Sequence, residues 1–149
     1  MKREILFRGK RVDNDEWVYG KGLQQCKDEL GNEIVAIFED IVKSEKYIKK
    51  GGRYTLYYAP VKAETLGQYT GLKDKNGKKI FEGDIVHIKG DGFDGKEVGV
   101  DYHRVVTFHD GTLCLSVGDV FHTPINDYVH GLDDWDVVGN ITDTPELMK

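Results

Sequence analysis

The amino-acid sequence predicts a mainly β protein made of short antiparallel strands, because of its glycine content and the pattern of its apolar residues. Glycine accounts for 18 of the 149 residues and proline for only 3. The glycines separate short runs rich in β-branched and aromatic residues, such as residues 54–58 and 64–69, as is typical of strands joined by tight turns. Residues 38–50 are the best candidate for a helix, although their apolar residues match helical spacing only in part.

The first half of the chain contains three further strand candidates, at residues 5–8, 16–21 and 33–38. Two polar pairs, Asn14-Asp15 and Gly31-Asn32, lie between these candidates. Asparagine and glycine both tolerate a positive φ, so each pair is predicted to form the tip of a turn.

The second half contains strand candidates at residues 84–89, 97–109 and 135–141, of which the middle one is long or broken. The pair Asp110-Gly111 is the strongest short-range signal for a hairpin. Short strands with tight turns, entered through residues 82–84, predict a small curled sheet or SH3-like barrel at the C-terminal end. We expect one domain over residues 1–149, with possible sub-units at 1–66 and 67–149.

Signals for export or membrane insertion are missing from the sequence. No apolar run approaches the roughly 18 residues of a membrane-spanning helix, and no apolar stretch near the start is long enough for a secretory signal. Cys26 and Cys114 lack the spacing of a zinc site and are expected to stay reduced. Cys114 is expected to be a small, half-buried filler in a strand. These features predict a cytoplasmic protein with no membrane contact.

The charge of the chain is divided unevenly along its length. Residues 1–79 carry 17 Lys and Arg against 12 Asp and Glu, which gives +5, whereas residues 80–149 carry 4 against 14, which gives −10. Such a division indicates a basic surface for an anionic partner, two complementary surfaces of an assembly, or a charge that serves only solubility.

One glycine-rich stretch, residues 90–96, matches two phosphate-binding patterns, G-x-G-x-x-G and G-x-x-x-x-G-K. Both patterns need a helix next, but a predicted strand follows here, and Glu97 stands where a P-loop needs Ser or Thr. Asp91 and Asp94 would place negative charge where phosphates lie, and their spacing differs from that of a calcium loop. We therefore interpret the stretch as a hairpin turn.

Histidine and serine side chains give no recognisable catalytic or metal-binding pattern. The five histidines are His87, His103, His109, His122 and His130. Their spacings match no known metal site, and we interpret them as turn or surface residues. If the strand is unbroken, His103 and His109 share one of its faces. Ser44 and Ser116 lack the G-x-S-x-G elbow of a serine nucleophile. The sequence thus predicts no metal, no cofactor and no enzyme activity.

Basic and tyrosine side chains gather between residues 43 and 58. The candidate anion- or partner-binding residues are Lys43, Lys46, Lys49, Lys50, Arg53 and Tyr57. Tyr47, Tyr54 and Tyr58 accompany them. Cations contact phosphates and flat rings stack on unpaired bases, so the segment fits nucleic-acid binding. The acidic chain overall and the lack of a named nucleic-acid-binding signature oppose that hypothesis.

Three segments carry a family resemblance: residues 3–20, the central run QYTGLKDKNGKKIFEGDIV at residues 68–86, and residues 137–141 leading to 145–147. Together they resemble the YopX family of small proteins encoded by bacteriophages and prophages. The central run is similar to the family pattern Q-Y-T-G-L-x-D-K-N-G-x-x-I-[YF]-E-G-D-I-V. The resemblance runs nearly end to end, and it is poor at residues 22–62 and 87–134, where we expect variation.

The resemblance implies a bacterial host, a cytoplasmic location and a shared fold, but no activity, substrate or catalytic residue. In the central run, Asn76-Gly77 favours a tight hairpin. Asp74, Glu82 and Asp84 are interpreted as turn-capping carboxylates in preference to catalytic ones. The leading functional hypothesis is a non-enzymatic accessory protein that acts through contacts with host or phage proteins, as a homo-oligomer. The alternative is a nucleic-acid-binding accessory factor.

Overall fold

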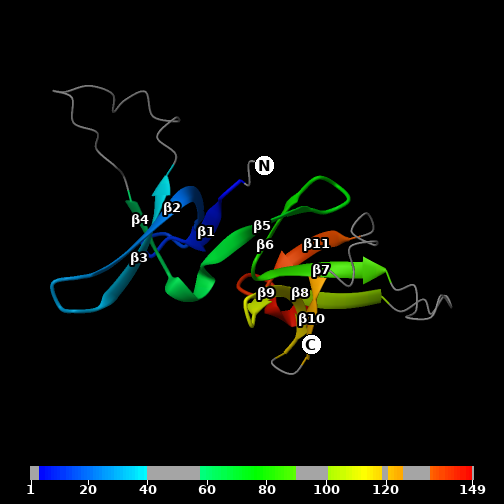
Figure 1. Ribbon diagram of the computed structural model, residues 1–149. Coiled ribbons are helices and arrows are strands. Elements are labelled where there is room, and N and C mark those ends of the chain that lie inside the picture. The colour runs from blue at the N-terminus through cyan, green and yellow to red at the C-terminus, as the bar shows by residue number, and fades with distance from the viewer. Residues whose placement is uncertain (1–3, 40–57, 90–100, 119–120, 126–134, 149) are drawn as a thin grey trace. The chain divides into compact units, whose positions relative to one another are not determined.

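The structure, a computed structural model, describes residues 4–39, 58–89, 101–118, 121–125 and 135–148. These residues form eleven β-strands and short 3-10 helices (Figure 1). All strand pairs are antiparallel, so the prediction of a mainly β protein with short antiparallel strands is confirmed. Among the described residues, no helix has the length and apolar character needed to cross a membrane.

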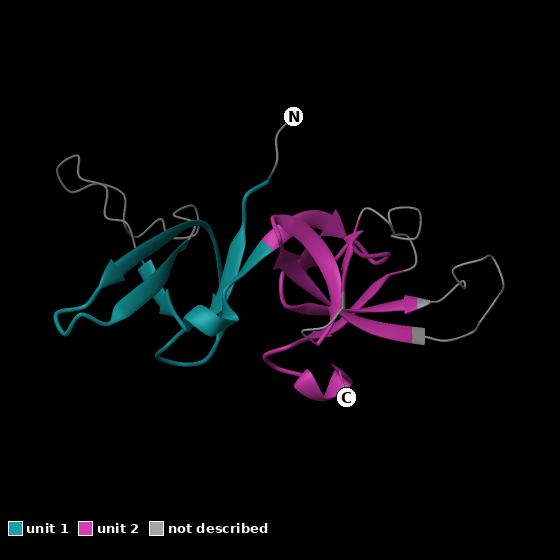
Figure 2. Cartoon of the chain, turned by 60° about the horizontal axis from the view of Figure 1, so that its bottom comes forward, with its two compact units in different colours: residues 1–68 teal, residues 69–149 magenta. Residues whose placement is uncertain are grey.

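The chain divides into two compact units, residues 1–68 and 69–149 (Figure 2). The elements of unit 1 are β1 (Phe7–Lys10), β2 (Trp17–Lys27), β3 (Glu33–Glu39), β4 (Tyr58–Val61) and the 3-10 helix η3 (Ala63–Thr65). Strand β5 (Gly67–Lys73) begins in unit 1, where it pairs with β1, and continues into unit 2, where it pairs with β6 (Lys79–Phe81). The remaining elements are β7 (Asp84–Lys89), β8 (Asp101–His109), β9 (Thr112–Val117), β10 (Phe121–Pro124), β11 (Asp136–Asn140) and the 3-10 helix η5 (Pro145–Met148).

The first sheet has six strands in the order β4-β3-β2-β1-β5-β6, of which β4, β3, β2, β1 and the start of β5 belong to unit 1. Side chains alternate between the two faces of a strand, and one face carries the buried cluster Val18, Ile37, Ala59 and Val61. Strand β2 has a register shift between Gly20 and Gly22. Glycine is required at the first of these positions, because a Cβ on Gly20 would lie 1.8 Å from the carbonyl oxygen of Phe38.

The turns predicted from polar pairs are confirmed. Asp15 has a φ of 62° and Gly31 a φ of 84°, the left-handed conformation expected at such turn tips. The Asp28 carboxylate stabilises the second turn by accepting hydrogen bonds from the backbone N–H groups of Leu30 and Asn32. Strand β2 extends six residues beyond the predicted end at residue 21, to Lys27.

Unit 2 contains a five-stranded sheet with the order β10-β9-β8-β7-β11. Its core cluster consists of Ile80, Val86, Val106, Leu115, Ile125 and Trp135. The opposite face is buried in part as well, since Ile85 and Val105 are 0% and 8% exposed. The predicted Asp110-Gly111 hairpin joins β8 to β9, with φ values of 47° and 76°. The SH3-like closure of this part stays a prediction.

Two local expectations differ from the structure. The helix candidate at residues 38–50 overlaps strand β3 at Phe38 and Glu39, and its remainder lies outside the described residues. Tertiary pairing with β2 and β4 overrides the weak helical spacing at that end. Cys114 is buried, at 3% exposure, where a half-buried position was expected, because both faces of β9 are covered at that point.

Candidate binding face

The six candidate residues of the basic segment, Lys43, Lys46, Lys49, Lys50, Arg53 and Tyr57, lie outside the described residues. The glycine-rich stretch at residues 90–96 and His130 also lie outside them. The described structure resumes at Tyr58, the last tyrosine of the basic segment, which begins strand β4. The candidate site therefore consists of described residues on β3 and β4, the strands that the segment connects, and on the neighbouring strands β2 and β1.

Tyr58 belongs to an aromatic pair on the face of unit 1 that is opposite the core. It is the register partner of Phe38 on β3, and the two ring centroids lie 4.4 Å apart. Gly22 is the partner of Phe38 on β2, and a Cβ there would lie 2.9 Å from the Phe38 ring. The glycine thus leaves room for the phenylalanine ring. Tyr58 remains 44% exposed.

Two further aromatic residues lie on this same face. Trp17 and Tyr19 flank Val18 on β2, and because Val18 belongs to the core face, its two neighbours point to the other one. Tyr19 is 48% exposed. We call the four residues Trp17, Tyr19, Phe38 and Tyr58 the aromatic face.

Strand β1 brings two cations to the aromatic face. Arg8 is the register partner of Tyr19, and Lys10 is the partner of Trp17. The guanidinium carbon of Arg8 lies 4.9 Å from the Trp17 ring centroid, and Nζ of Lys10 lies 5.6 Å from it. Both distances are in the range of a cation–π interaction. Both cations are largely covered, since Arg8 is 7% exposed and the side chain of Lys10 is 14% exposed.

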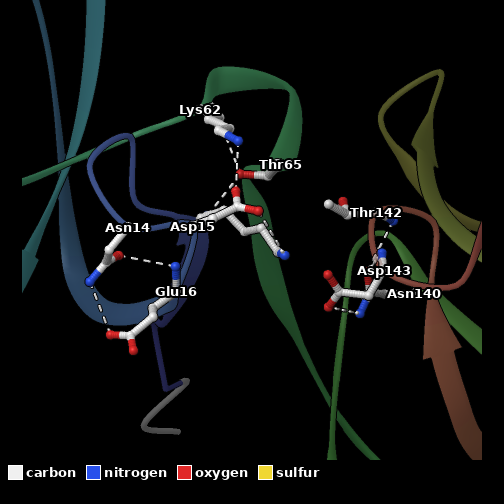
Figure 3. A network of polar contacts seen from close by, with 9 residues as sticks. Asn14, Asp15, Glu16, Lys62, Thr65, Asn140, Thr142 and Asp143 are labelled. Atoms are coloured by element: carbon white, nitrogen blue, oxygen red, sulfur yellow. Dashed lines mark hydrogen bonds and ion pairs between the residues drawn. The ribbon is translucent and has the colours of Figure 1, made fainter.

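The turn between β1 and β2 is tied to η3 beside this face (Figure 3). Nζ of Lys62 donates to Oδ1 of Asp15 at 2.6 Å, and Nζ of Lys10 lies 3.7 Å from Oδ2 of Asp15. The hydrogen bond from Lys62, with the charge of Lys10, holds the pKa of the Asp15 carboxyl below its ordinary value. The backbone N–H of Lys10 donates to Oγ1 of Thr65 at 2.8 Å. These contacts position the end of β1 that carries Lys10.

A second polar cluster joins three strands of unit 2. Oγ of Ser116 lies 2.7 Å from Nδ1 of His122 and 2.5 Å from Oγ1 of Thr107. The His109 and His122 rings stack with centroids 3.9 Å apart and 12° between their planes. Sequence analysis missed the serine–histidine pair, because the signal is the β9–β10 register, which sets Ser116 opposite His122.

The serine–histidine pair has the composition of a catalytic nucleophile and its base, but a catalytic serine must be accessible to substrate and Ser116 is not. Ser116 is 2% exposed, and its hydroxyl is already bonded to both Thr107 and His122. A substrate carbon cannot approach an oxygen enclosed in this way. The cluster therefore satisfies buried polar groups between strands. His103 and His109 lie in one strand, β8, so the alternative of a break between them no longer applies.

Histidines elsewhere in unit 2 also take structural contacts. His87 and His103 are register partners with ring centroids 5.6 Å apart, and Nδ1 of His103 lies 3.0 Å from the carbonyl oxygen of Leu147. Within the described ranges, no group of three or more His, Cys, Asp and Glu residues is arranged to hold a metal ion.

The carboxylates of the central run cap turns. Oδ1 of Asp74 accepts hydrogen bonds from the backbone N–H groups of Asn76 and Lys78, and Oδ2 accepts one from Val137 on β11. Oδ2 of Asp84 accepts one from the N–H of Phe81. The two carboxylates are 6% and 1% exposed. The capping interpretation is therefore confirmed for both, and the central run serves the fold.

The chain is similar to known proteins in sequence family and in fold. The chain belongs to the YopX family: the YopX protein family model matches residues 6–149. The structure is similar to protein EF1440 from Enterococcus faecalis, with 26% identity, a TM-score of 0.54, and 97% of this chain and 98% of that chain covered.

It is also similar to protein YopX from Bacillus subtilis, with 18% identity, a TM-score of 0.50, and 97% of this chain and 95% of that chain covered. At this sequence identity, the second comparison shows a similar fold and nothing more. No curated protein matches the chain. The family resemblance drawn from three segments of the sequence is thus confirmed.

Proposed function

We propose that this YopX-family chain is a bacteriophage or prophage accessory protein that acts in the bacterial cytoplasm through protein contacts, as a homo-oligomer, and not as an enzyme. The division of charge carries this proposal. Residues 1–68 hold 13 Lys and Arg against 11 Asp and Glu, whereas residues 69–149 hold 8 against 15. The net charges of the two units are therefore +2 and −7.

Opposite charges on two parts of one chain favour a head-to-tail contact between copies, in which the basic part of one copy meets the acidic part of the next. The basic excess of unit 1 comes from residues 40–57, where five Lys and Arg accompany only Asp40 and Glu45. Enclosure of the Ser116 hydroxyl supports a non-catalytic role, since the serine–histidine pair is engaged within the sheet.

The oligomer is tested by light scattering after size-exclusion chromatography. Replacing Lys46, Lys49 and Lys50 together with Glu is expected to shift the protein toward the monomer and to leave the melting temperature unchanged, because lysine is rarely buried in proteins and a surface charge contributes little stability. The control reverses three exposed lysines outside the segment, Lys27, Lys73 and Lys78, and so changes the net charge equally.

Two results would contradict the oligomer proposal. One is a wild-type protein that is monomeric at micromolar concentration. The other is an equal dissociation by the control, since the effect would then follow the total charge and not the segment.

A further inference from the structure

We propose that His87 and His103, which face each other across β7 and β8, bind a divalent transition-metal ion of the zinc type. The site lies in unit 2 and is separate from the contact between copies, so it goes beyond the proposed function. Imidazole nitrogens are preferred ligands of zinc, nickel and copper ions. Strand pairing, and not sequence spacing, brings the two side chains together.

The pairing of β7 with β8 places the two imidazoles on one side of the sheet. His87 and His103 are direct register partners of these antiparallel strands, so their Cβ atoms point the same way. The two ring centroids lie 5.6 Å apart. Both residues are partly exposed, so an ion from solvent can reach the rings.

The distance between the rings fits one shared ion. A zinc ion lies about 2.0–2.1 Å from each ring nitrogen that binds it, and hence about 3.2 Å from each ring centroid. Two centroids around one tetrahedral ion are then about 5.2 Å apart. The 5.6 Å between His87 and His103 is within a few tenths of an ångström of this value. Binding therefore needs a rotation of the rings and no movement of the strands.

The angle between the ring planes is the second geometric argument. The lone pair of a ring nitrogen lies in the ring plane, so an ion bound by two imidazoles lies where the two planes meet. The planes of His87 and His103 are 67° apart and meet close to the rings. Those of His109 and His122 are only 12° apart, and these rings are stacked at 3.9 Å. Unit 2 thus holds one histidine pair that suits an ion and one that does not.

A hydrogen bond fixes the proton on the ring of His103. Nδ1 of His103 donates to the carbonyl oxygen of Leu147 at 3.0 Å, since a carbonyl oxygen can only accept. In the neutral ring Nε2 then carries the lone pair. A metal-binding histidine typically makes such a hydrogen bond from its second ring nitrogen. His103 is therefore set up to bind a metal through Nε2.

A carboxylate lies in the same row of the sheet, on the other side of His87. Asp136 on β11 is the register partner of His87, but Lys75 contacts this carboxylate and offsets its charge. Among the residues that the structure describes, no group of three or more His, Cys, Asp and Glu is arranged around an ion. We therefore assign two protein ligands to the site, and water completes the coordination.

The experiment measures thermal unfolding of the full chain, freed of metal by dialysis against EDTA and then against buffer. All proteins carry Cys26→Ser, because Cys26 is exposed and a thiolate also binds zinc. A ligand that binds only the folded state raises the melting temperature. We expect zinc chloride to raise it and magnesium chloride to leave it unchanged, since magnesium prefers oxygen ligands.

Alanine variants locate the ion. His87→Ala and His103→Ala each remove one of the two ligands and should weaken zinc binding by about tenfold or more, because even the loss of an outer partner of a metal ligand costs about 10–100-fold. Isothermal titration calorimetry measures the affinity. The matched controls are His109→Ala and His122→Ala, which remove rings of the stacked pair and should bind zinc as the parent protein does.

Nitrogen NMR of the imidazole rings tests the same site without a variant in unit 2. Zinc should shift the Nε2 signal of His103 and a ring nitrogen signal of His87. The signals of His109 and His122 should stay in place. This readout remains decisive if the alanine variants fail to fold.

The proposal is overturned if zinc raises the melting temperature no more than magnesium does. It is overturned as well if folded His87→Ala and His103→Ala bind zinc as tightly as the controls, or if zinc shifts the ring signals of other histidines in place of these two. The lysine-reversal test addresses the contact between copies separately, so either proposal can fail alone.

Discussion

The two units are both antiparallel sheets, but they bury their faces differently. In unit 1 the core cluster lies on one face, and the other face leaves Tyr19 and Tyr58 about half exposed. In unit 2, the consecutive residues Ile85 and Val86 are both 0% exposed, so β7 is covered on both faces at this point. Exposed rings are available to a ligand, whereas doubly covered strands hold a structure together.

Buried polar side chains occur in both units, and Arg8 and Thr65 of unit 1 are 7% and 8% exposed. In unit 2 the polar residues Asp74, Asp84 and Ser116 are at most 6% exposed, and each is hydrogen-bonded to another segment or turn. In unit 1 the side chains of Asp15 and Lys62 are 57% and 39% exposed although they are paired. Buried and satisfied polar groups specify a fold, and exposed charged ones remain open to partners. The buried polar groups of unit 2 therefore have structural roles, whereas Asp15 and Lys62 of unit 1 remain accessible to solvent.

The largest expected difference between the units is the cost of removing one aromatic side chain. Trp135→Ala should lower the free energy of unfolding by about 3–5 kcal/mol, because the fully buried ring would leave a cavity in the core of unit 2. Tyr58→Ala in unit 1 should cost much less, about 1 kcal/mol, as is typical of a partly exposed position. Urea unfolding followed by circular dichroism measures both, and equal losses would contradict the comparison.

A somewhat smaller loss is expected from the central run. Asp74→Ala removes the acceptor of three backbone N–H groups and should destabilise the protein by about 2–4 kcal/mol. The control Glu29→Ala removes an exposed carboxylate and should change stability by less than about 0.5 kcal/mol. An Asp74→Ala protein as stable as this control would show that the turn and β11 do not depend on the carboxylate.

Much of the fold follows from local sequence, and the turns are the clearest case. Asn14-Asp15, Gly31-Asn32 and Asp110-Gly111 form turns as predicted, because the conformational preferences of Asn, Asp and Gly act within a few residues.

The candidate face did not follow from local sequence, for a physical reason. It requires Tyr58 beside Phe38, which are 20 residues apart in the chain, and Trp17 beside Arg8 and Lys10 across the β1–β2 hairpin. A one-residue change of register moves every side chain of a strand to the other face, and β2 contains such a shift after Gly20. The sequence instead indicated the adjacent basic segment, where the cations and tyrosines are contiguous.

Two glycines of β2, Gly20 and Gly22, pack closely against Phe38 of the aromatic face. Gly20→Ala should destabilise the protein by about 1–3 kcal/mol, because the added methyl group meets the Phe38 backbone, which cannot move aside. Gly22→Ala meets the Phe38 ring at 2.9 Å and should cost less, since a side chain can rotate. Thermal unfolding of both variants distinguishes them, and a larger loss for Gly22→Ala would contradict the order of the contacts.

The smallest expected effect is the pH dependence of an ion pair at the surface of unit 2. A hydrogen bond from Lys75 is the main reason that the pKa of the Asp136 carboxyl is below its ordinary value. The charge of Lys75, a hydrogen bond from the Asn76 amide and the charge of His87 lower this pKa further. A carboxyl with a lowered pKa in the folded state stabilises the protein above its unfolded pKa, about 3.9. This contribution is lost as the pH falls through the folded-state pKa.

Asp136→Asn should therefore lower the urea midpoint slightly at pH 7, and the difference from the wild type should shrink as the pH falls below about 4. The corresponding variant in unit 1 is Asp28→Asn, since hydrogen bonds from the Asn32 side chain and backbone likewise hold the pKa of the Asp28 carboxyl low. No cation contributes to the lowered pKa of Asp28, so the loss of stability in Asp28→Asn should not depend on salt. The loss of stability in Asp136→Asn should decrease as salt screens the charge of Lys75. A difference between Asp136→Asn and the wild type that stays constant from pH 7 to about pH 3 would show that the amide changes packing and not charge.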